Sequence, residues 1–156
     1  MLQIDIPDFG QLHLEHLVMD YNGTMAVDGE PIQGIRRRVD KLALQLQVHV
    51  ITADTFGKVQ AMLEDWACSV KILGHEDQVG QKLAFVQELG ATSCVCVGNG
   101  RNDRMMLEAA GLGLAVMLEE GTSRESLLSA DIALPGIIPA LDLLINPLRL
   151  TATLRS

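Results

Sequence analysis

Short apolar runs alternate along the chain with longer segments that mix apolar and polar residues. The runs cover residues 16–20, 48–52, 70–73, 94–98, 112–117 and, more weakly, 131–134. Continuous apolar runs of this length, bounded by turn residues, are typical of strands that are buried on both faces of a sheet. The pattern therefore predicts a mainly parallel β-sheet.

The segments between the runs carry apolar residues at the spacing of one helix face. These residues are Ile35, Val39, Leu42 and Leu46 after the first run, Phe56, Val59, Met62, Leu63 and Trp66 after the second, and Val79, Leu83, Val86 and Leu89 after the third. Residues 105–110 and 137–145 supply two further helices. This alternation predicts a layered α/β fold whose right-handed connections bring the carboxyl ends of the strands to one edge, where ligands bind.

The two ends of the chain depart from this alternation. Residues 2–6 and 11–15 alternate apolar and polar positions around a Pro-Asp-Phe-Gly turn, which predicts a β-hairpin within residues 1–15. An Asn-Pro pair opens residues 146–156 and should end the preceding helix. This C-terminal tail carries three leucines, and we expect it to pack on the body of the domain or on a second copy.

Composition and charge narrow the functional classes. The 156 residues are 48% apolar, so the chain is long enough for one compact domain and too short for two, and we expect a single domain over residues 1–156. The net charge of −8 disfavours nucleic acids and anionic membranes as partners. No apolar run approaches the roughly 20 residues of a membrane helix, and no leader pattern opens the chain. We therefore expect a cytoplasmic protein.

The sulfur and imidazole side chains have structural explanations. Cys94 and Cys96 alternate within an apolar run instead of forming a Cys-x-x-Cys pair, so we interpret them as small buried residues. The four histidines lack the spacing of metal ligands. Met105 and Met106 are expected to fill the core.

Polar residues gather where the predicted strands end. Asp20 closes the first strand and is followed by an Asn-Gly-Thr turn, Thr52 closes the second, and Lys82 lies in the helix after the third. The fourth strand is followed by Gly-Asn-Gly-Arg-Asn-Asp, residues 98–103. Taken singly, Asp54 and Thr55 could cap one helix, Asn102 or Asp103 could cap the next, and Lys82 could be a solvated charge. The ordered set Asp, Thr, Lys, Asp instead indicates phosphoryl transfer.

A dinucleotide site is the main alternative for the glycine-rich turn. The third glycine of that fingerprint would fall at position 103, where an aspartate would repel a pyrophosphate. A phosphate site that is assisted by a metal ion agrees better with this residue.

The ordered motifs closely resemble those of the haloacid dehalogenase (HAD) superfamily of phosphotransferases. They correspond to residues 20–24 (Asp-Tyr-Asn-Gly-Thr), residues 50–54 (Val-Ile-Thr-Ala-Asp), Lys82 and residues 97–103. Within the superfamily, residues 98–103, 113–117 and 130–134 are most similar to the phosphorylation domain of P-type cation ATPases and to small proteins described as soluble P-type ATPases. Without membrane helices, we do not expect this chain alone to pump ions.

The resemblance implies a three-layer Rossmann-like fold and a Mg²⁺-dependent phosphohydrolase that acts on a small phosphorylated substrate through an aspartyl-phosphate. The implied catalytic residues are Asp20, Asn22, Thr52 and Lys82. The implied phosphate-binding residues are Gly23, Thr24, Thr52, Ala53 and Lys82. The implied metal ligands are Asp20, Asn22 through its backbone carbonyl, Asn99 and Asp103.

Two positions depart from the family pattern. Family phosphatases have an aspartate at position 22, which protonates the leaving group and activates water, whereas asparagine can do neither. General acid–base assistance is worth about 10²–10⁴-fold, so we expect slow release of phosphate. Asn99 replaces a metal-binding aspartate and should weaken magnesium binding. The water-activating base is not identified, and Asp54, Glu30, His75 or a partner protein are equal candidates.

The spacing of the motifs leaves no room for a cap domain, and residues 25–34 can form only a small flap. A capless enzyme must exclude water in another way, so we expect a homo-oligomer whose neighbour covers the site. Two functions from other classes remain open. One is a regulatory module that binds phosphate with little or no turnover. The other, ranked last, is a response-regulator receiver domain, which places its acidic pair and its phosphorylated aspartate differently along the chain.

Overall fold

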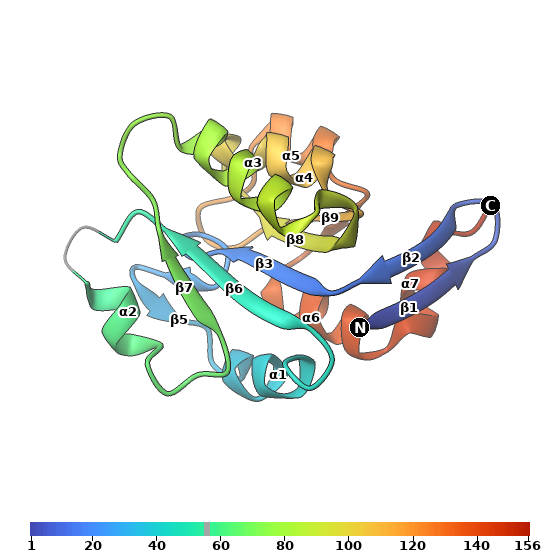
Figure 1. Cartoon of the computed structure of the whole chain (residues 1–156), viewed down its shortest axis with the longest axis horizontal. Helices are drawn as coiled ribbons and strands as arrows, with labels where there is room; N and C mark the ends of the chain where they lie inside the picture. The colour runs from blue at the N-terminus through green and yellow to red at the C-terminus, as the bar shows by residue number, and fades with distance from the viewer. Residues whose placement is uncertain (55–56) are drawn as a thin grey trace.

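A six-stranded, entirely parallel sheet forms the centre of the computed structural model, which describes residues 1–54 and 57–156 (Figure 1). The strands follow the order β10-β9-β8-β3-β6-β7. Their bounds are β3 His16–Asp20, β6 Gln47–Thr52, β7 Ser69–Ile72, β8 Cys94–Gly98, β9 Leu112–Val116 and β10 Ile132–Leu134. The predicted parallel sheet is confirmed.

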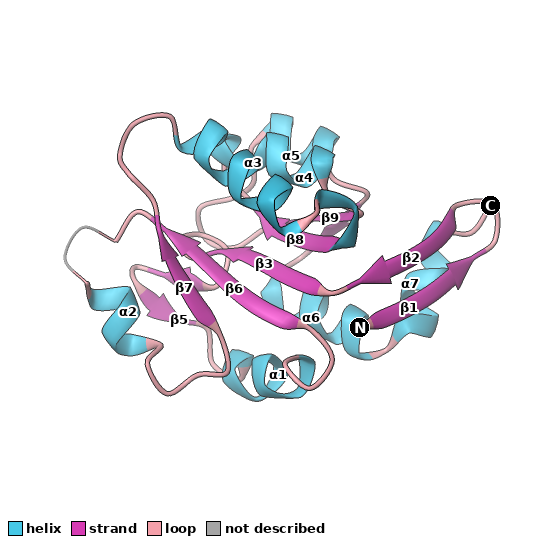
Figure 2. Ribbon diagram, viewed as in Figure 1, coloured by secondary structure: helices cyan, strands magenta, loops and turns pink. Residues whose placement is uncertain are grey.

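Helices cover both faces of the sheet and complete three layers (Figure 2). One face carries α3 (Gln78–Leu89), α4 (Arg104–Ala109) and α5 (Arg124–Ser129), and the other carries α1 (Ile35–Leu42) and α6 (Ile137–Ile145). Successive side chains of a strand point to opposite faces. Leu17 and Met19 accordingly pack in the core beneath α1 and α6, whereas Val18 packs with Val86 of α3 on the other side.

The strand order places the end of β3 at a switch point. From β3 the chain moves outward to β6 and β7, and α3 then carries it back to β8 on the opposite side of β3. The carboxyl ends of β3, β6 and β8 therefore lie side by side, with Asp20, Thr52 and Gly98 as their last residues. Ligands of open α/β sheets bind in the crevice at this position.

The predicted N-terminal hairpin is confirmed as β1 (Leu2–Ile6) paired with β2 (Gly10–Leu14). The C-terminal segment forms α7 (Pro147–Leu154), which begins with the proline of the Asn-Pro pair and packs against β1 with Leu150 fully buried. It therefore packs on its own chain. No single helix among the described residues is long and apolar enough to cross a membrane; α6 and α7 reach that length and composition only together and are bent by 102°.

A small flap separates β3 from α1. It consists of β4 (Ala26–Val27) and β5 (Glu30–Pro31), joined by Asp28 and Gly29 with φ angles of 52° and 84°. Two positive φ angles in a two-residue connection characterise a type I′ turn, for which Asp-Gly is a favoured sequence. The described part of the connection between β6 and β7 contains only the short helix α2 (Lys58–Met62). The capless architecture is thus confirmed.

Four local predictions were wrong. The first helix, which was expected to include Leu46, ends at Leu42. Strand β7 is largely exposed, because it is the outer strand of the sheet and one of its edges has no neighbour. The helix expected to continue to Trp66 ends at Met62, where the chain turns back toward β7, and Phe56 lies outside the described residues. Met105 is 39% exposed on the outer side of α4, whereas Met106 is fully buried as expected.

Candidate active site

A buried lysine joins two aspartates at the carboxyl edge of the sheet. The Nζ atom of Lys82 donates to Oδ1 of Asp20 at 2.7 Å and to Oδ1 of Asp103 at 2.6 Å. The side chain of Lys82 is 2% exposed, that of Asp103 is fully buried and that of Asp20 is 13% exposed. Asp20 therefore presents the accessible carboxylate of this group.

The loop after β8 holds Asp103 in this position. Its Oδ2 atom accepts hydrogen bonds from the backbone N–H groups of Asn99, at 3.0 Å, and of Gly100, at 2.9 Å. A Cβ atom at Gly98 would lie 2.5 Å from Cγ of Asp103, so only glycine leaves room for the carboxylate to fold back onto the loop. Both oxygens of Asp103 are thereby engaged before any ligand binds.

Burial and neighbouring charges shift the pKa values of both Asp20 and Lys82. Burial, followed by the negative charge of Asp103, raises the pKa of Asp20 to about 7, although Lys82 opposes the shift. Burial alone would lower the pKa of Lys82, but the carboxylates of Asp20 and Asp103 outweigh it and the net shift is upward. Lys82 therefore stays protonated at neutral pH, and a bound cation would favour the ionised form of Asp20.

The hydroxyl group of Thr52 is buried without a hydrogen bond to any residue that the structure describes. Thr52 ends β6 beside Asp20 and is 3% exposed, and among the described residues its Oγ1 atom makes no hydrogen bond. A buried polar group without a hydrogen bond costs about 1–3 kcal/mol. This unpartnered hydroxyl therefore indicates a place for a polar ligand.

Asn99 is held on the other side of Asp20. Its Oδ1 atom accepts a hydrogen bond of 3.3 Å from the buried Thr24, and its Nδ2 atom donates to the carbonyl of Gly121 at 3.1 Å. A Cβ atom at Gly23, where φ is 75°, would lie 2.6 Å from both Nδ2 of Asn99 and Oε2 of Glu120. Gly23 thus allows these two side chains to approach the loop after β3, within about 5 Å of each other.

Six of the predicted site residues line one cavity of about 290 Å³, which we call the central cavity. They are Asp20, Asn22, Thr52, Ala53, Lys82 and Asn99. Gly23, Thr24 and Asp103 do not line it and support the wall from behind. Among the described residues, no three His, Cys, Asp or Glu side chains are placed to hold a metal ion, so a cation here would need carbonyl and amide oxygens as well.

Glu120 and Gln78 also line the central cavity and were not among the predicted site residues. Gln78 is the first residue of α3, and its Oε1 atom accepts a hydrogen bond of 2.8 Å from Nδ2 of Asn102. Glu120 follows β9, whose carboxyl end lies at the same edge of the sheet as that of β8. Polar residues that follow the carboxyl ends of earlier strands were predicted to form the site, and the same reasoning applied to β9 would have identified Glu120.

A second cavity, of about 330 Å³, lies between the flap and α2, and we call it the flap cavity. Glu30 and Asp54, two of the candidate bases, line it, whereas His75 lines neither cavity. The Oδ2 atom of Asp54 accepts from the backbone N–H of Val59 at 2.8 Å, so the capping role considered for Asp54 is present. Thr55, the other capping candidate, lies outside the described residues.

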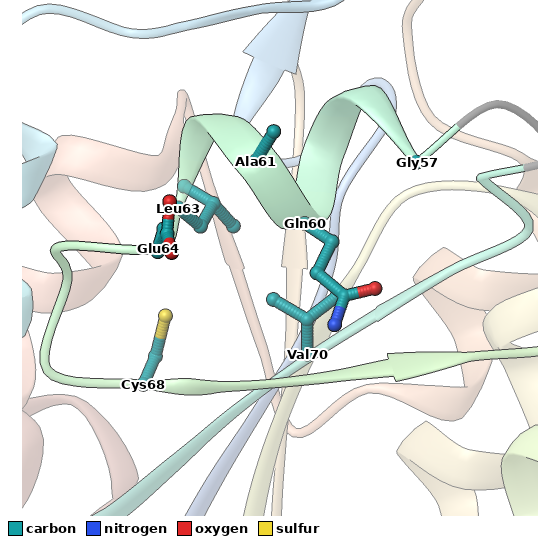
Figure 3. Close-up of a pocket in the computed structure, with 7 residues that line it drawn as sticks. All are labelled: Gly57, Gln60, Ala61, Leu63, Glu64, Cys68 and Val70. Atoms are coloured by element: carbon teal, nitrogen blue, oxygen red, sulfur yellow. The ribbon is translucent and has the colours of Figure 1, made fainter.

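Other candidate groups lie away from this edge. A cavity of about 450 Å³ between α2 and β7 is lined by Gln60, Leu63, Cys68 and Val70 among others, and contains none of the predicted site residues (Figure 3). His16 and His49 contact each other at 3.2 Å, and His49 also contacts Ser69, so they are satisfied structural residues. Burial raises the pKa of the thiols of Cys94 and Cys96, as expected for small core residues.

Comparison with known proteins identifies one relative by sequence and several by structure. No family model matches the chain. The uncharacterized protein MJ0073 of Methanocaldococcus jannaschii is 41% identical over 78 residues, which cover 47% of this chain and 84% of MJ0073.

Two solved structures illustrate the similarity in fold. One is the 3-deoxy-D-manno-octulosonate (KDO) 8-phosphate phosphatase of Moraxella catarrhalis, in complex with magnesium, phosphate and KDO, with 18% identity, a TM-score of 0.66 and coverage of 85% of this chain and 86% of that one. The other is described as an HAD-family hydrolase from Streptomyces avermitilis, with 17% identity, a TM-score of 0.64 and coverage of 85% and 84%. The chain therefore belongs to the same family as MJ0073, and its fold is similar to that of the haloacid dehalogenase-family hydrolases.

Proposed function

We propose that the protein is a magnesium-dependent phosphomonoester hydrolase that forms an aspartyl-phosphate on Asp20. The observation that carries this proposal is the side chain of Thr52, which lines the same cavity as Asp20 and Lys82 and whose buried hydroxyl makes no hydrogen bond to any described residue. A phosphate oxygen is a suitable acceptor for that hydroxyl, and Lys82 supplies positive charge for the phosphoryl group.

The reaction has two steps. In the first, a carboxylate oxygen of Asp20 attacks phosphorus, the bond from phosphorus to the ester oxygen breaks, and the departing alkoxide takes a proton from solvent water. In the second, water attacks the same phosphorus, the bond to Asp20 breaks, and inorganic phosphate is released. Thr52 and Lys82 hold the phosphoryl oxygens in both steps, and Asp103 positions Lys82 between the two carboxylates.

Magnesium fits the donors present, which are hard oxygen atoms. Asp20, the carbonyl of Asn22 and Asn99 would hold it, and Glu120 supplies a further carboxylate nearby. Asp103 is better suited to an indirect role, because its side chain is fully buried and does not line the central cavity. When bound, the ion neutralises charge and so reduces the repulsion between Asp20 and the phosphate.

Asn22 lines both the central cavity and the flap cavity, which is the position from which an acid would assist the leaving alcohol. An asparagine there can hold a hydrogen bond but cannot transfer a proton, so turnover should be slow. The same observation favours the second candidate, a regulatory module that binds phosphate and retains it on Asp20. For either function we propose a small phosphorylated ligand and a homo-oligomer that shields the capless site.

Release of phosphate from p-nitrophenyl phosphate and from a panel of metabolites, with and without magnesium, tests the proposal. Metal-dependent release that disappears in Asp20→Asn is the expected result. Release that is unchanged in Asp20→Asn would overturn it. Binding of phosphate without turnover of any substrate would favour the regulatory module.

A further inference from the structure

The flap cavity adjoins the central cavity, and the two share three residues of the predicted site. Asn22, Thr52 and Ala53 line both cavities. Thr52, whose hydroxyl is buried and has no partner among the described residues, is thus part of the wall where the two spaces meet. A phosphate group that binds this hydroxyl has the flap cavity directly beside it.

The walls of the flap cavity are well defined. Tyr21 is fully buried, and its hydroxyl donates to the carbonyl of Gly29 at 2.8 Å and contacts the sulfur of Met62 at 3.2 Å. These contacts fix the turn of the flap against α2. Asp54 is held in turn by the backbone N–H groups of Val59, at 2.8 Å, and Gln60, at 3.4 Å.

The charged residues that line the flap cavity are predominantly acidic. Asp28 and Glu30 come from the flap and Asp54 from the end of β6, and the single basic residue among the described lining residues is Lys58. Burial raises the pKa of Tyr21 to about 12, and the charges of Glu30 and Asp54 add to the shift. The negative field of these carboxylates therefore reaches the buried end of the cavity.

We propose that the flap cavity receives the alcohol portion of the substrate and selects alcohols that carry an ammonium group over alcohols that carry a carboxylate. The substrate class is then a phosphate monoester of an amino alcohol or amino sugar. This inference rests on the proposed phosphate site. One opposite or like charge near an exposed carboxylate changes affinity by about two- to fivefold, and the cationic and anionic alcohols differ by two charges in a cavity lined by three carboxylates, so their affinities should differ by at least about tenfold.

The test uses three esters with the same two-carbon skeleton, namely phosphoethanolamine, 2-hydroxyethyl phosphate and phosphoglycolate. Their binding is measured by calorimetry with magnesium and the variant Asp20→Asn, which cannot cleave them, and inorganic phosphate serves as the reference ligand. We expect phosphoethanolamine to bind at least about tenfold more tightly than phosphoglycolate, with the neutral ester between them.

A matched pair of variants assigns the preference to this cavity. In the Asp20→Asn background, Asp28→Asn combined with Glu30→Gln should reduce the ratio of the affinities for phosphoethanolamine and phosphoglycolate to about threefold or less. Asparagine also tolerates the positive φ of position 28, so the turn is kept. The control combines Asp8→Asn, at another turn with a positive φ of 64°, with Glu15→Gln; it changes the net charge equally and should preserve the ratio.

The outcomes separate the inference from the proposed function. If inorganic phosphate does not bind, the proposed phosphate site fails and this inference fails with it. If phosphate binds but phosphoglycolate binds as tightly as phosphoethanolamine, only the inference is overturned. If the preference exists but the control pair abolishes it as completely as the flap pair, the flap cavity is not its source.

Discussion

Replacing Thr52 with valine separates a ligand-binding role of its hydroxyl from a structural role. Valine keeps the shape and exchanges the hydroxyl for a methyl group, and Oγ1 of Thr52 has no hydrogen bond among the described residues to lose. The free energy of unfolding without ligand should therefore stay unchanged or rise by about 1 kcal/mol. A hydrogen bond to a charged phosphate contributes about 1.5–3 kcal/mol, so phosphate affinity should fall about 10- to 150-fold.

Urea unfolding and calorimetric titration with phosphate and magnesium measure these two quantities. Thr24→Val is the matched control, because the hydroxyl of Thr24 is equally buried but donates to Asn99, and its loss should cost about 1 kcal/mol of stability. Phosphate affinity equal to that of the wild type in Thr52→Val would refute the reasoning. So would a loss of stability as large as that of the control, because it would show that the hydroxyl has a partner within the fold.

Three further substitutions test the chemistry of the site. Asn22→Asp should raise phosphate release from alkyl phosphates by about 10²-fold, and an unchanged rate would show that a missing acid does not limit turnover. Asp20→Asn should stabilise the metal-free protein, because the raised pKa of Asp20 makes its ionised form destabilising, by up to about 4 kcal/mol at pH 8. In thermal unfolding, the difference in stability between the variant and the wild type should vanish toward pH 4. Equal pH dependence of the two proteins would contradict this. Glu120→Gln should weaken magnesium binding about tenfold by calorimetry, whereas Glu119→Gln, the exposed neighbour outside the cavity, should not; equal effects would exclude a local role for Glu120.

The buried centre of the fold was predictable because its signal is local. Strands β3, β8 and β9 are continuous apolar runs, and each is almost entirely buried between two helical layers. The run at 70–73 gives the same signal, yet β7 is exposed because it has a neighbour on one side only. Whether a strand is central or peripheral depends on the order of strands in the sheet, which periodicity along the chain does not contain.

The candidate site was predictable to the extent that its residues follow strands. Asp20 and Thr52 end adjacent strands, so their convergence follows from the parallel sheet alone. Lys82 was placed near them by motif order, but its contact with Asp103 depends on the path of α3 across the sheet. Glu120 was missed because polar residues were sought after the ends of earlier strands but not after β9. Its approach to Asn99 depends on the space left by Gly23.

Asn22 and the acidic flap cavity are connected by the chemistry of the leaving group. If the proposed function holds, Asn22 lies between the reacting phosphate and the departing alcohol, where it can donate a hydrogen bond but cannot transfer a proton. The first step then depends on how acidic the departing alcohol is by itself. An ammonium group near the ester oxygen withdraws electrons and lowers the pKa of that alcohol, so the cationic substrates favoured by Asp28 and Glu30 are also those that least need an acid at position 22. Restoring that acid by Asn22→Asp should accordingly accelerate 2-hydroxyethyl phosphate more than phosphoethanolamine, and an equal acceleration in steady-state assays would break the connection.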